Sequence, residues 1–362
     1  MAAPSQSEHH DVAVVGGGVI GLAVAWRAAQ RGLRTLVLDA AEDGAWRYAA
    51  GMLAPVTEAE FGEDALLGLG LRALDGFPAF CAELGVDLRR EGTLVVARDR
   101  DEAEELDRLY EHRRALGLEV ERLRPSQARR AEPALAPTVR LALDVPGDAA
   151  VDPRALVVAL TAAVERAGAE VRRERVSDLT ALPADQVVIA AGAWSGKLGA
   201  MPVRPVKGQI MRLRDPAGQD LVTRTIRTRE GYLVPRGEGR YVLGVTVEER
   251  GWDTAPTSGA TLELIRDLAE VVPGVLELEI EELGAGLRPG TPDNLPIIGS
   301  AAGLVWATGH YRSGILLADV TAEAVVSVLA GDGLPEWAAA CDPARFARRG
   351  EAGDEAPAEA VA

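Results

Sequence analysis

The sequence predicts a mixed α/β fold in which a parallel-sheet domain is interleaved with an antiparallel-sheet domain. Strand and helix patterns alternate at the start of the chain. Short apolar strands that run into glycines return at residues 187–192 and 304–309, as in a buried parallel sheet. Between them, residues 202–246 show the short paired strands of an antiparallel sheet. The chain is therefore expected to leave one domain and later to return to it.

The first elements enclose a glycine-rich loop. An apolar strand runs into Gly16, Gly18 and Gly21 at G-x-G-x-x-G spacing, and an Ala-rich helix to Gln30 and a second strand ending at Asp39 follow. The glycines allow a tight turn beside a pyrophosphate, which binds where the free N–H groups of the helix start point. The acid suits a ribose hydroxyl. This order predicts a Rossmann-like dinucleotide-binding domain.

The middle of the chain is expected to continue both domains. Residues 99–131 form a charged helical stretch. Asp152 is a good cap and Pro153 suits a first helical turn, so a helix should run from there to about Arg166. Residues 187–192 read as a buried strand with a glycine turn.

Later elements follow in the same way. The expected strands and helices are a strand at 208–213, a hairpin of 232–234 with 241–243, a helix at 258–271, strands at 276–281 and 304–307, and a helix at 315–329. We expect a cofactor-binding domain at 11–80, 150–200 and 284–335, a substrate domain at 81–149 and 201–283, and a disordered tail at 351–362.

Composition limits the function. The net charge of −16 over 362 residues argues against nucleic acid or an anionic membrane as the main partner. No apolar run reaches the roughly 18 residues of a membrane span, and the first ten residues lack the pattern of a signal peptide. Cys81 and Cys341 fit no metal spacing and are expected to be idle thiols, so we predict no metal site and a soluble, cytoplasmic protein.

Four polar side chains are candidates for chemistry. Arg288 and Arg312 lie in glycine-punctuated segments that read as turns, where a guanidinium could pair bidentately with a carboxylate, cap a turn or form a surface ion pair. Tyr232 could offer its phenol to a carboxylate or be a strand aromatic. His310 could be a base or a structural residue. Catalytic Ser-His-Asp and Cys-His spacings are absent from the sequence.

Four passages, at residues 14–21, 49–53, 286–291 and 309–318, together resemble one family. The chain is similar to FAD-dependent amine oxidases of the D-amino-acid oxidase superfamily, most closely to glycine oxidases of the thiamine pathway. The resemblance covers residues 11 to about 335. It departs from the family at residues 46–48, where small hydroxyl residues are usual, and at Val247, where a relative can have a methionine in the pocket.

The resemblance implies non-covalent FAD and a set of positions that hold it. The implied cofactor-binding residues are Gly16, Gly18, Val19, Ile20, Gly21, Asp39, Ala50, Gly51, Met52, Val176, Gly192, His310, Gly314, Ile315 and Leu316. The implied substrate-binding residues are Arg288, Tyr232 and Arg312. A helix start near Gly314 would stabilise the reduced flavin. No certain catalytic acid or base is implied, because substrate positioning over the flavin is enough for this chemistry.

The implied reaction is oxidative deamination of glycine to an imine or glyoxylate, ammonia and hydrogen peroxide, supplying thiazole synthesis. A thiazole synthase is then a possible downstream partner, and the protein a possible homo-oligomer. Two alternatives stay open at this point. One is a related oxidase or dehydrogenase of sarcosine, D-amino acids or 2-hydroxy acids, and the other is a flavin-binding protein without turnover.

Overall fold

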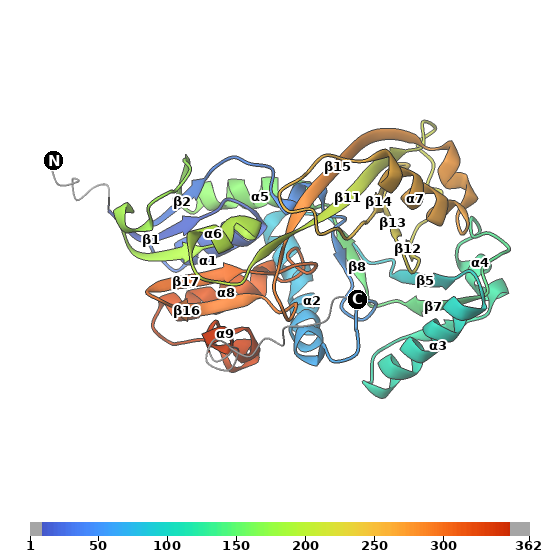
Figure 1. The fold of residues 1–362 in the computed structure, drawn as a ribbon, viewed down its shortest axis with the longest axis horizontal. Helices are drawn as coiled ribbons and strands as arrows, with labels where there is room; N and C mark the ends of the chain where they lie inside the picture. The colour runs from blue at the N-terminus through green and yellow to red at the C-terminus, as the bar shows by residue number, and fades with distance from the viewer. Residues whose placement is uncertain (1–8, 348–362) are drawn as a thin grey trace, which may run out of the picture.

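The computed structural model describes residues 9–347, and its first large sheet is mostly parallel (Figure 1). Its strands are β1 (His10–Val15), β2 (Thr35–Asp39), β9 (Glu170–Arg173), β10 (Ala184–Ile189), β16 (Ile297–Ala301) and β17 (Leu304–Thr308). They lie in the order β16-β17-β10-β1-β2-β9, and only the β16–β17 pair is antiparallel. The sheet therefore unites the beginning, the middle and the end of the chain.

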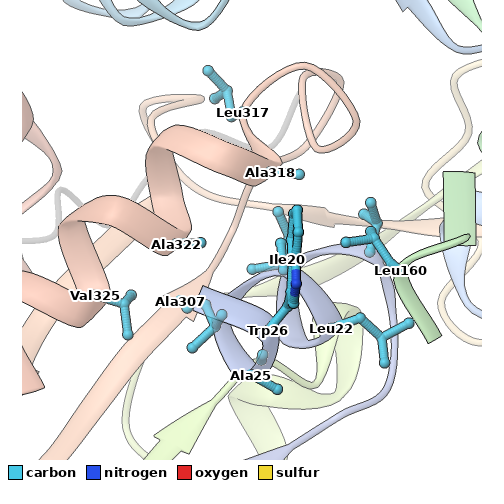
Figure 2. Packing of buried hydrophobic residues seen from close by; sticks show 14 of the residues in the cluster. Ile20, Leu22, Ala25, Trp26, Leu160, Ala307, Leu317, Ala318, Ala322 and Val325 are labelled. Carbon is cyan, nitrogen blue, oxygen red and sulfur yellow. The ribbon is translucent and has the colours of Figure 1, made fainter. Parts of the chain in front are cut away.

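Helices cover this sheet and form the largest core with it. The helices are α1 (Val19–Gln30), α2 (Asp64–Leu84), α5 (Pro153–Arg166) and α8 (Ala318–Leu329). Figure 2 shows Trp26 of α1, Leu160 of α5 and Ala322 of α8 among the buried residues of this cluster. Alanines in α1 and α8 let the two helices approach closely, and each large apolar side chain contributes roughly 1.5–3 kcal/mol by leaving water.

The second large sheet is mixed and almost entirely antiparallel. Its strands are β5 (Thr93–Ala97), β6 (Glu121–Leu123), β7 (Leu141–Val145), β11 (Arg204–Arg214), β12 (Thr225–Arg227), β13 (Tyr232–Gly237), β14 (Arg240–Gly244) and β15 (Glu279–Gly290). Their order is β15-β11-β14-β13-β12-β5-β7-β6, and only β12 and β5 run parallel. The long strands β11 and β15 pair over most of their length and extend toward the first sheet (Figure 1).

Shorter elements complete the molecule. They are a small sheet of β3 (Met52–Leu53), β4 (Leu88–Arg89) and β8 (Ala149–Val151), the helices α3 (Arg100–Ala115), α4 (Pro125–Ala131), α6 (Ser195–Leu198), α7 (Ser258–Ala269) and α9 (Ala344–Ala347), and the 3-10 helices η1 (Ala45–Tyr48), η2 (Leu179–Ala181), η3 (Gly192–Trp194), η4 (Pro273–Glu277) and η5 (Glu336–Cys341). Helix α7 packs its buried residues against one side of the second sheet.

Most element predictions are confirmed. The mixed fold, the first strand–helix–strand unit and the 232–243 hairpin are present. Helix α5 spans the predicted residues, and the Asp152 carboxylate accepts a 2.8 Å hydrogen bond from the Arg154 amide. The charged stretch at 99–131 contains two helices separated by β6. The proposed tail at 351–362 lies outside the described residues.

The prediction of a glycine turn around Arg288 is wrong. Strand β15 continues through residues 286–290 and pairs with β11 up to Gly290. Its glycines serve close packing, since a Cβ on Gly284 would come within 2.1 Å of the Tyr48 ring. The strand also crosses the predicted domain boundary at residue 284, and the first sheet resumes only at β16.

The last long helix begins later than predicted. Helix α8 starts at Ala318 rather than at Ile315, because residues 311–317 form a succession of tight turns. Two of these turns are closed by backbone hydrogen bonds, from Ser313 to His310 at 2.9 Å and from Leu317 to Ser313 at 2.9 Å.

Helix α2 is, within residues 9–347, the helix long and apolar enough to cross a membrane by length and composition. One stripe of it, comprising Leu69, Ala73, Phe77, Phe80 and Leu84, is buried in the largest core. The helix packs there against α5 and α8. This helical spacing is typical of a core helix of a folded domain.

Three buried acidic groups keep their protons more tightly than in water. Cys81 and Cys341 are free thiols, and burial raises the pKa of each to about 11. Burial also raises the pKa of the Asp148 carboxyl to about 7, with a neighbouring Thr57 hydroxyl acting in the opposite direction. Asp148 is 1% exposed and accepts a hydrogen bond from that hydroxyl.

The core of α5 can be tested with two substitutions on one helix. Leu160 is 0% exposed and Val158 is 70% exposed. Leu160→Ala should lower the free energy of unfolding by about 2–5 kcal/mol, because it removes buried methyl groups and leaves a cavity. Val158→Ala should change it by about 0.5 kcal/mol or less. Equal losses in urea unfolding would contradict the arrangement of this helix.

The raised pKa of Asp148 predicts a pH dependence of stability. The folded protein keeps this proton up to about pH 7, whereas the unfolded chain loses it near pH ~4. The contribution of Asp148 is therefore present below pH ~4 and is lost as the pH rises through about 7. Urea unfolding of the wild type and of Asp148→Asn, measured at steps across this range, should show the wild-type advantage shrinking toward pH 7. A constant difference would show that the carboxyl is already ionised at the low end.

Candidate functional site

A large cavity of about 1920 Å³ is lined by residues of both large sheets. Loops that follow β1, β2, β10 and β17 line one end of it. The other end is lined by Tyr232, Arg288 and their neighbours on the second sheet. In an open parallel sheet, ligands bind at the carboxyl ends of the strands, and this cavity lies there.

The glycine loop after β1 has the shape of an anion site. Gly16 has φ +115°, and a Cβ on it would lie 2.4 Å from the Ala190 carbonyl oxygen, so only glycine fits. Gly18 is the N-cap of α1 and offers no side chain to its first amides, and the first turn contains no acid. These amides therefore remain available for a phosphate, and the helix dipole favours one.

Asp39 ends β2 and lines the same part of the cavity. Its carboxylate accepts a 3.2 Å hydrogen bond from the Ala41 amide and lies beside Gly17. A carboxylate here can accept from the hydroxyls of a ribose whose phosphates lie at α1.

Thirteen of the fifteen predicted cofactor positions line the cavity. They are Gly16, Gly18, Val19, Ile20, Asp39, Ala50, Gly51, Met52, Val176, Gly192, His310, Gly314 and Ile315. Gly21 does not, because it packs against the Gly16 carbonyl, where a Cβ would lie at 1.9 Å. Leu316 does not either, because it is 5% exposed within the largest core. The structure shows a packing role for these two residues, and their contact with the cofactor stays a prediction.

Arg288 lies flat on the second sheet at the other end of the cavity. A Cβ on Gly208 would lie 2.3 Å from both terminal nitrogens of its guanidinium, so the bare backbone of β11 makes room for it. One of these nitrogens donates to the carbonyls of Thr246 at 3.2 Å and Lys207 at 3.4 Å. No carboxylate of residues 9–347 lies within 4.0 Å of the guanidinium. A cation with this environment favours binding of an anion from the cavity.

Tyr232 lies on the same face of the sheet. Its ring covers Gly244, where a Cβ would come within 2.9 Å of the ring, and the residue is 8% exposed. Burial raises the pKa of the phenol, with the positive charge of Arg288 acting in the opposite direction. The phenol is therefore protonated at neutral pH and can donate a hydrogen bond beside the guanidinium.

Arg312 differs from Arg288 in having a partner. Its guanidinium donates to the Glu63 carboxylate at 3.1 Å, and Glu63 also accepts from Asn294 at 2.6 Å. Both arginines line the cavity, but Arg312 is neutralised by an acid and Arg288 is not. The structure thus separates two residues that looked equivalent in the sequence.

His310 is buried and only 3% exposed. Its Nε2 lies 2.9 Å from the Thr321 hydroxyl of α8, and burial lowers its pKa to about 3. The ring is therefore neutral and a weak base, which favours its structural interpretation.

Two of the cavity residues to which the sequence assigned no role are informative. Tyr48 of η1 lies on the glycines of β15 and so joins the two ends of the cavity, and Arg227 ends β12 beside Tyr232. The alternate glycines Gly284 and Gly286 could have indicated an aromatic ring lying on the strand. Arg227 carries no comparable signal in its neighbourhood.

A buried network holds the turn that precedes Tyr232. The Thr228 hydroxyl donates to the Asp267 carboxylate at 2.5 Å and accepts from the Gly231 amide at 2.9 Å. Asp267, in α7, also accepts from Arg98 at 2.5 Å. Helix α7 and the end of β5 therefore fix the turn from which Tyr232 enters the cavity.

Comparisons with known proteins agree with this geometry. Residues 11–328 match the family described as FAD dependent oxidoreductase. The glycine oxidase of Geobacillus kaustophilus (strain HTA426) is 34% identical over 348 residues, which cover 87% of this chain and 91% of that protein. The crystal structure of the glycine oxidase from Geobacillus kaustophilus gives a TM-score of 0.85 at 32% identity and covers 92% of this chain and 98% of that one.

Two further relatives differ in what they contain. The bifunctional protein ThiO/ThiG of Trichormus variabilis is 31% identical over 352 residues, which cover 88% of this chain but only 52% of that longer protein. The iminodiacetate oxidase of Chelativorans sp. BNC1 gives a TM-score of 0.82 at 26% identity and covers 89% of this chain and 96% of that one.

The network at Asp267 can be tested by stability. The Asp267 side chain is 8% exposed, and Asp267→Ala leaves Arg98 and the Thr228 hydroxyl without this partner. We expect a loss of about 1–3 kcal/mol in the free energy of unfolding, because the Thr228 hydroxyl loses a buried partner while Arg98 keeps Glu102 and Glu270. Leu262→Ala on the same helix, at a position 63% exposed, is the control and should change it little. If Asp267→Ala lowered the free energy of unfolding no more than Leu262→Ala does, Asp267 would not anchor the turn before Tyr232.

Proposed function

The chain belongs to the family of FAD dependent oxidoreductases, and we propose that it catalyses the oxidative deamination of glycine with dioxygen as the electron acceptor. The observation that supports this most is the unpaired Arg288 guanidinium on Gly208, beside the Tyr232 phenol, in the cavity that contains the dinucleotide loop. The cation and the phenol suit a small carboxylate. The glycine oxidase of Geobacillus kaustophilus, 34% identical to this chain, supports the choice of glycine.

The residues present fit FAD as the cofactor. The Gly16 turn and the uncapped α1 amides would hold its pyrophosphate, and Asp39 would hold its ribose. The small residues Ala50 and Gly51 line the cavity toward the second sheet and leave room for a flat ring. When bound, FAD accepts two electrons from the substrate and passes them to dioxygen, which becomes hydrogen peroxide.

Residues of the second sheet would orient the substrate. The planar fork of Arg288 would donate hydrogen bonds to the carboxylate, and Tyr232 would donate to one carboxylate oxygen. Both side chains lie flat on glycines, so their positions are limited by backbone rather than by mobile neighbours. Fixing the carboxylate in this way restricts where the Cα–H bond can point, which is the main requirement of the reaction.

The reaction then needs no strong base from the protein. The Cα–H bond breaks and both of its electrons leave with the hydrogen, while the lone pair of the neutral amine forms the C=N bond of the imine. Water hydrolyses the imine to glyoxylate and ammonia. The low pKa of His310 and its bond to Thr321 agree with a mechanism that relies on positioning.

We also propose that the product serves thiazole synthesis in the thiamine pathway. The resemblance of this chain to half of a bifunctional ThiO/ThiG protein supports a thiazole synthase as the partner that consumes the imine. A cytoplasmic location and a homo-oligomeric state belong to the same proposal. Both can be tested by fractionation and by light scattering.

The related substrates sarcosine, D-amino acids and 2-hydroxy acids are the second candidates, because the same clamp would hold any of their carboxylates. Anaerobic mixing of the FAD-loaded protein with glycine, sarcosine, D-alanine and D-lactate should bleach the flavin absorbance fastest with glycine. Peroxide release in air should follow the same order. Faster bleaching by D-lactate than by every amine would contradict amine oxidation.

Two substitutions test the clamp. Arg288→Gln removes the cation, and Gly208→Ala places a methyl group where the guanidinium lies. We expect each to raise the KM for glycine about 10- to 100-fold, as loss of a charge-assisted hydrogen bond implies, with FAD content unchanged. Gly76→Ala is the control, since nothing lies within 4 Å of its added Cβ. An unchanged KM in Arg288→Gln would overturn the assignment.

A further inference from the structure

Arg227 is a second cation at the substrate end of the cavity. It ends β12 and lines the cavity with Tyr232. Within the described residues 9–347, no carboxylate lies within 4.0 Å of its guanidinium and no acceptor hydrogen-bonds to it. The arginines nearby are different, since Arg224 donates to Asp144 at 2.7 Å and Arg229 lies 3.5 Å from Glu230.

The register places Arg227 on the same face of the sheet as the carboxylate clamp. Arg227 pairs directly with Tyr232, which pairs with Gly244, which pairs with Ile210. Residues directly opposite each other in an antiparallel pair share a face, and Gly208 shares it with Ile210 two residues away. Arg227 and the Arg288 guanidinium therefore flank Tyr232 from opposite sides.

The spacing suits a substrate with two charges. The strand of Arg227 and the strand of Gly208 are separated by β14 and β13, which makes three strand spacings or about 14 Å. The positive charges of Arg288 and Arg227 both act to lower the pKa of the Tyr232 phenol, against the larger effect of burial, so both guanidinium groups lie near this residue. Glu58 also lines this part of the cavity, but it forms no ion pair within 4.0 Å with a described arginine.

We propose that Arg227 binds a second carboxylate of the substrate, so that the enzyme also oxidises amines that carry two carboxylates. The inference rests on the proposed function, since Arg288 would hold the carboxylate next to the reacting carbon in both cases. The chemistry is unchanged: the Cα–H bond breaks, the hydrogen leaves with both bond electrons, for which FAD would be the acceptor, and the amine lone pair forms the C=N bond of the imine. Only the group opposite Arg288 differs.

The test compares substrates that carry a second carboxylate with analogues of equal size in which that group is an uncharged amide. The pairs are iminodiacetate with its monoamide, and D-aspartate with D-asparagine. For the wild type, kcat/KM should be higher for the diacid in at least one pair. Arg227→Gln should lower this diacid-to-neutral ratio about 10-fold or more, and Arg227→Lys should keep part of it because the charge remains.

Arg240→Gln is the control for a general loss of positive charge, because Arg240 begins β14 in the same sheet, is exposed and does not line the cavity. A general effect of lost positive charge would lower the ratio equally in both glutamine variants and would overturn the proposal. A ratio that changes less than two-fold in Arg227→Gln would also overturn it. Glycine turnover by the wild type tests the proposed function separately, so a failure of either is recognisable.

Discussion

The position of the Arg288 guanidinium on the bare backbone of Gly208 is the contact on which the site depends. The side chain can lie along the sheet only because β11 has no Cβ at that point. The same device recurs where the Tyr232 ring covers Gly244 and where the Tyr48 ring covers Gly284. Glycines therefore leave space on one face of this sheet, and the side chains of Arg288, Tyr232 and Tyr48 occupy that space. The site is therefore positioned by strand register, which is stiffer than a loop.

This surface acts on a cofactor held by a different sheet, so the two sheets must keep a constant relation. The chain crosses between them several times, and β15 carries Arg288 directly into the segment that returns to the first sheet. A 3.1 Å hydrogen bond from the Tyr311 amide to the Pro289 carbonyl ties the turn after β17 to the end of β15. Tyr48 packs across the boundary from η1. Because the two domains are interleaved, the cofactor end of the cavity and the carboxylate clamp are joined by short segments whose backbones are hydrogen-bonded to each other.

The sequence predicted the parts that depend on local signals. The glycine loop and Asp39 follow from spacing alone, and helix α5 follows from Asp152 and Pro153 at its start. It failed where tertiary packing decides. Glycines at 286 and 290 look like a turn in sequence, yet in β15 they accommodate neighbours across the sheet. Residues 311–317 likewise form tight turns where the sequence predicted the start of a helix. The place of Arg227 in the site becomes visible only from its pairing with Tyr232 across the strands. Whether an arginine is neutralised, as Arg312 is by Glu63, depends on residues hundreds of positions apart.

The most direct measurement is a crystal structure of the FAD-loaded protein soaked with acetate, the simplest probe of a carboxylate site. The account predicts acetate in the fork of Arg288, with the guanidinium still on Gly208 and the Tyr232 hydroxyl within hydrogen-bond distance of one acetate oxygen. Acetate bound at Arg312 in place of Glu63, with Arg288 turned away from Gly208, would contradict it.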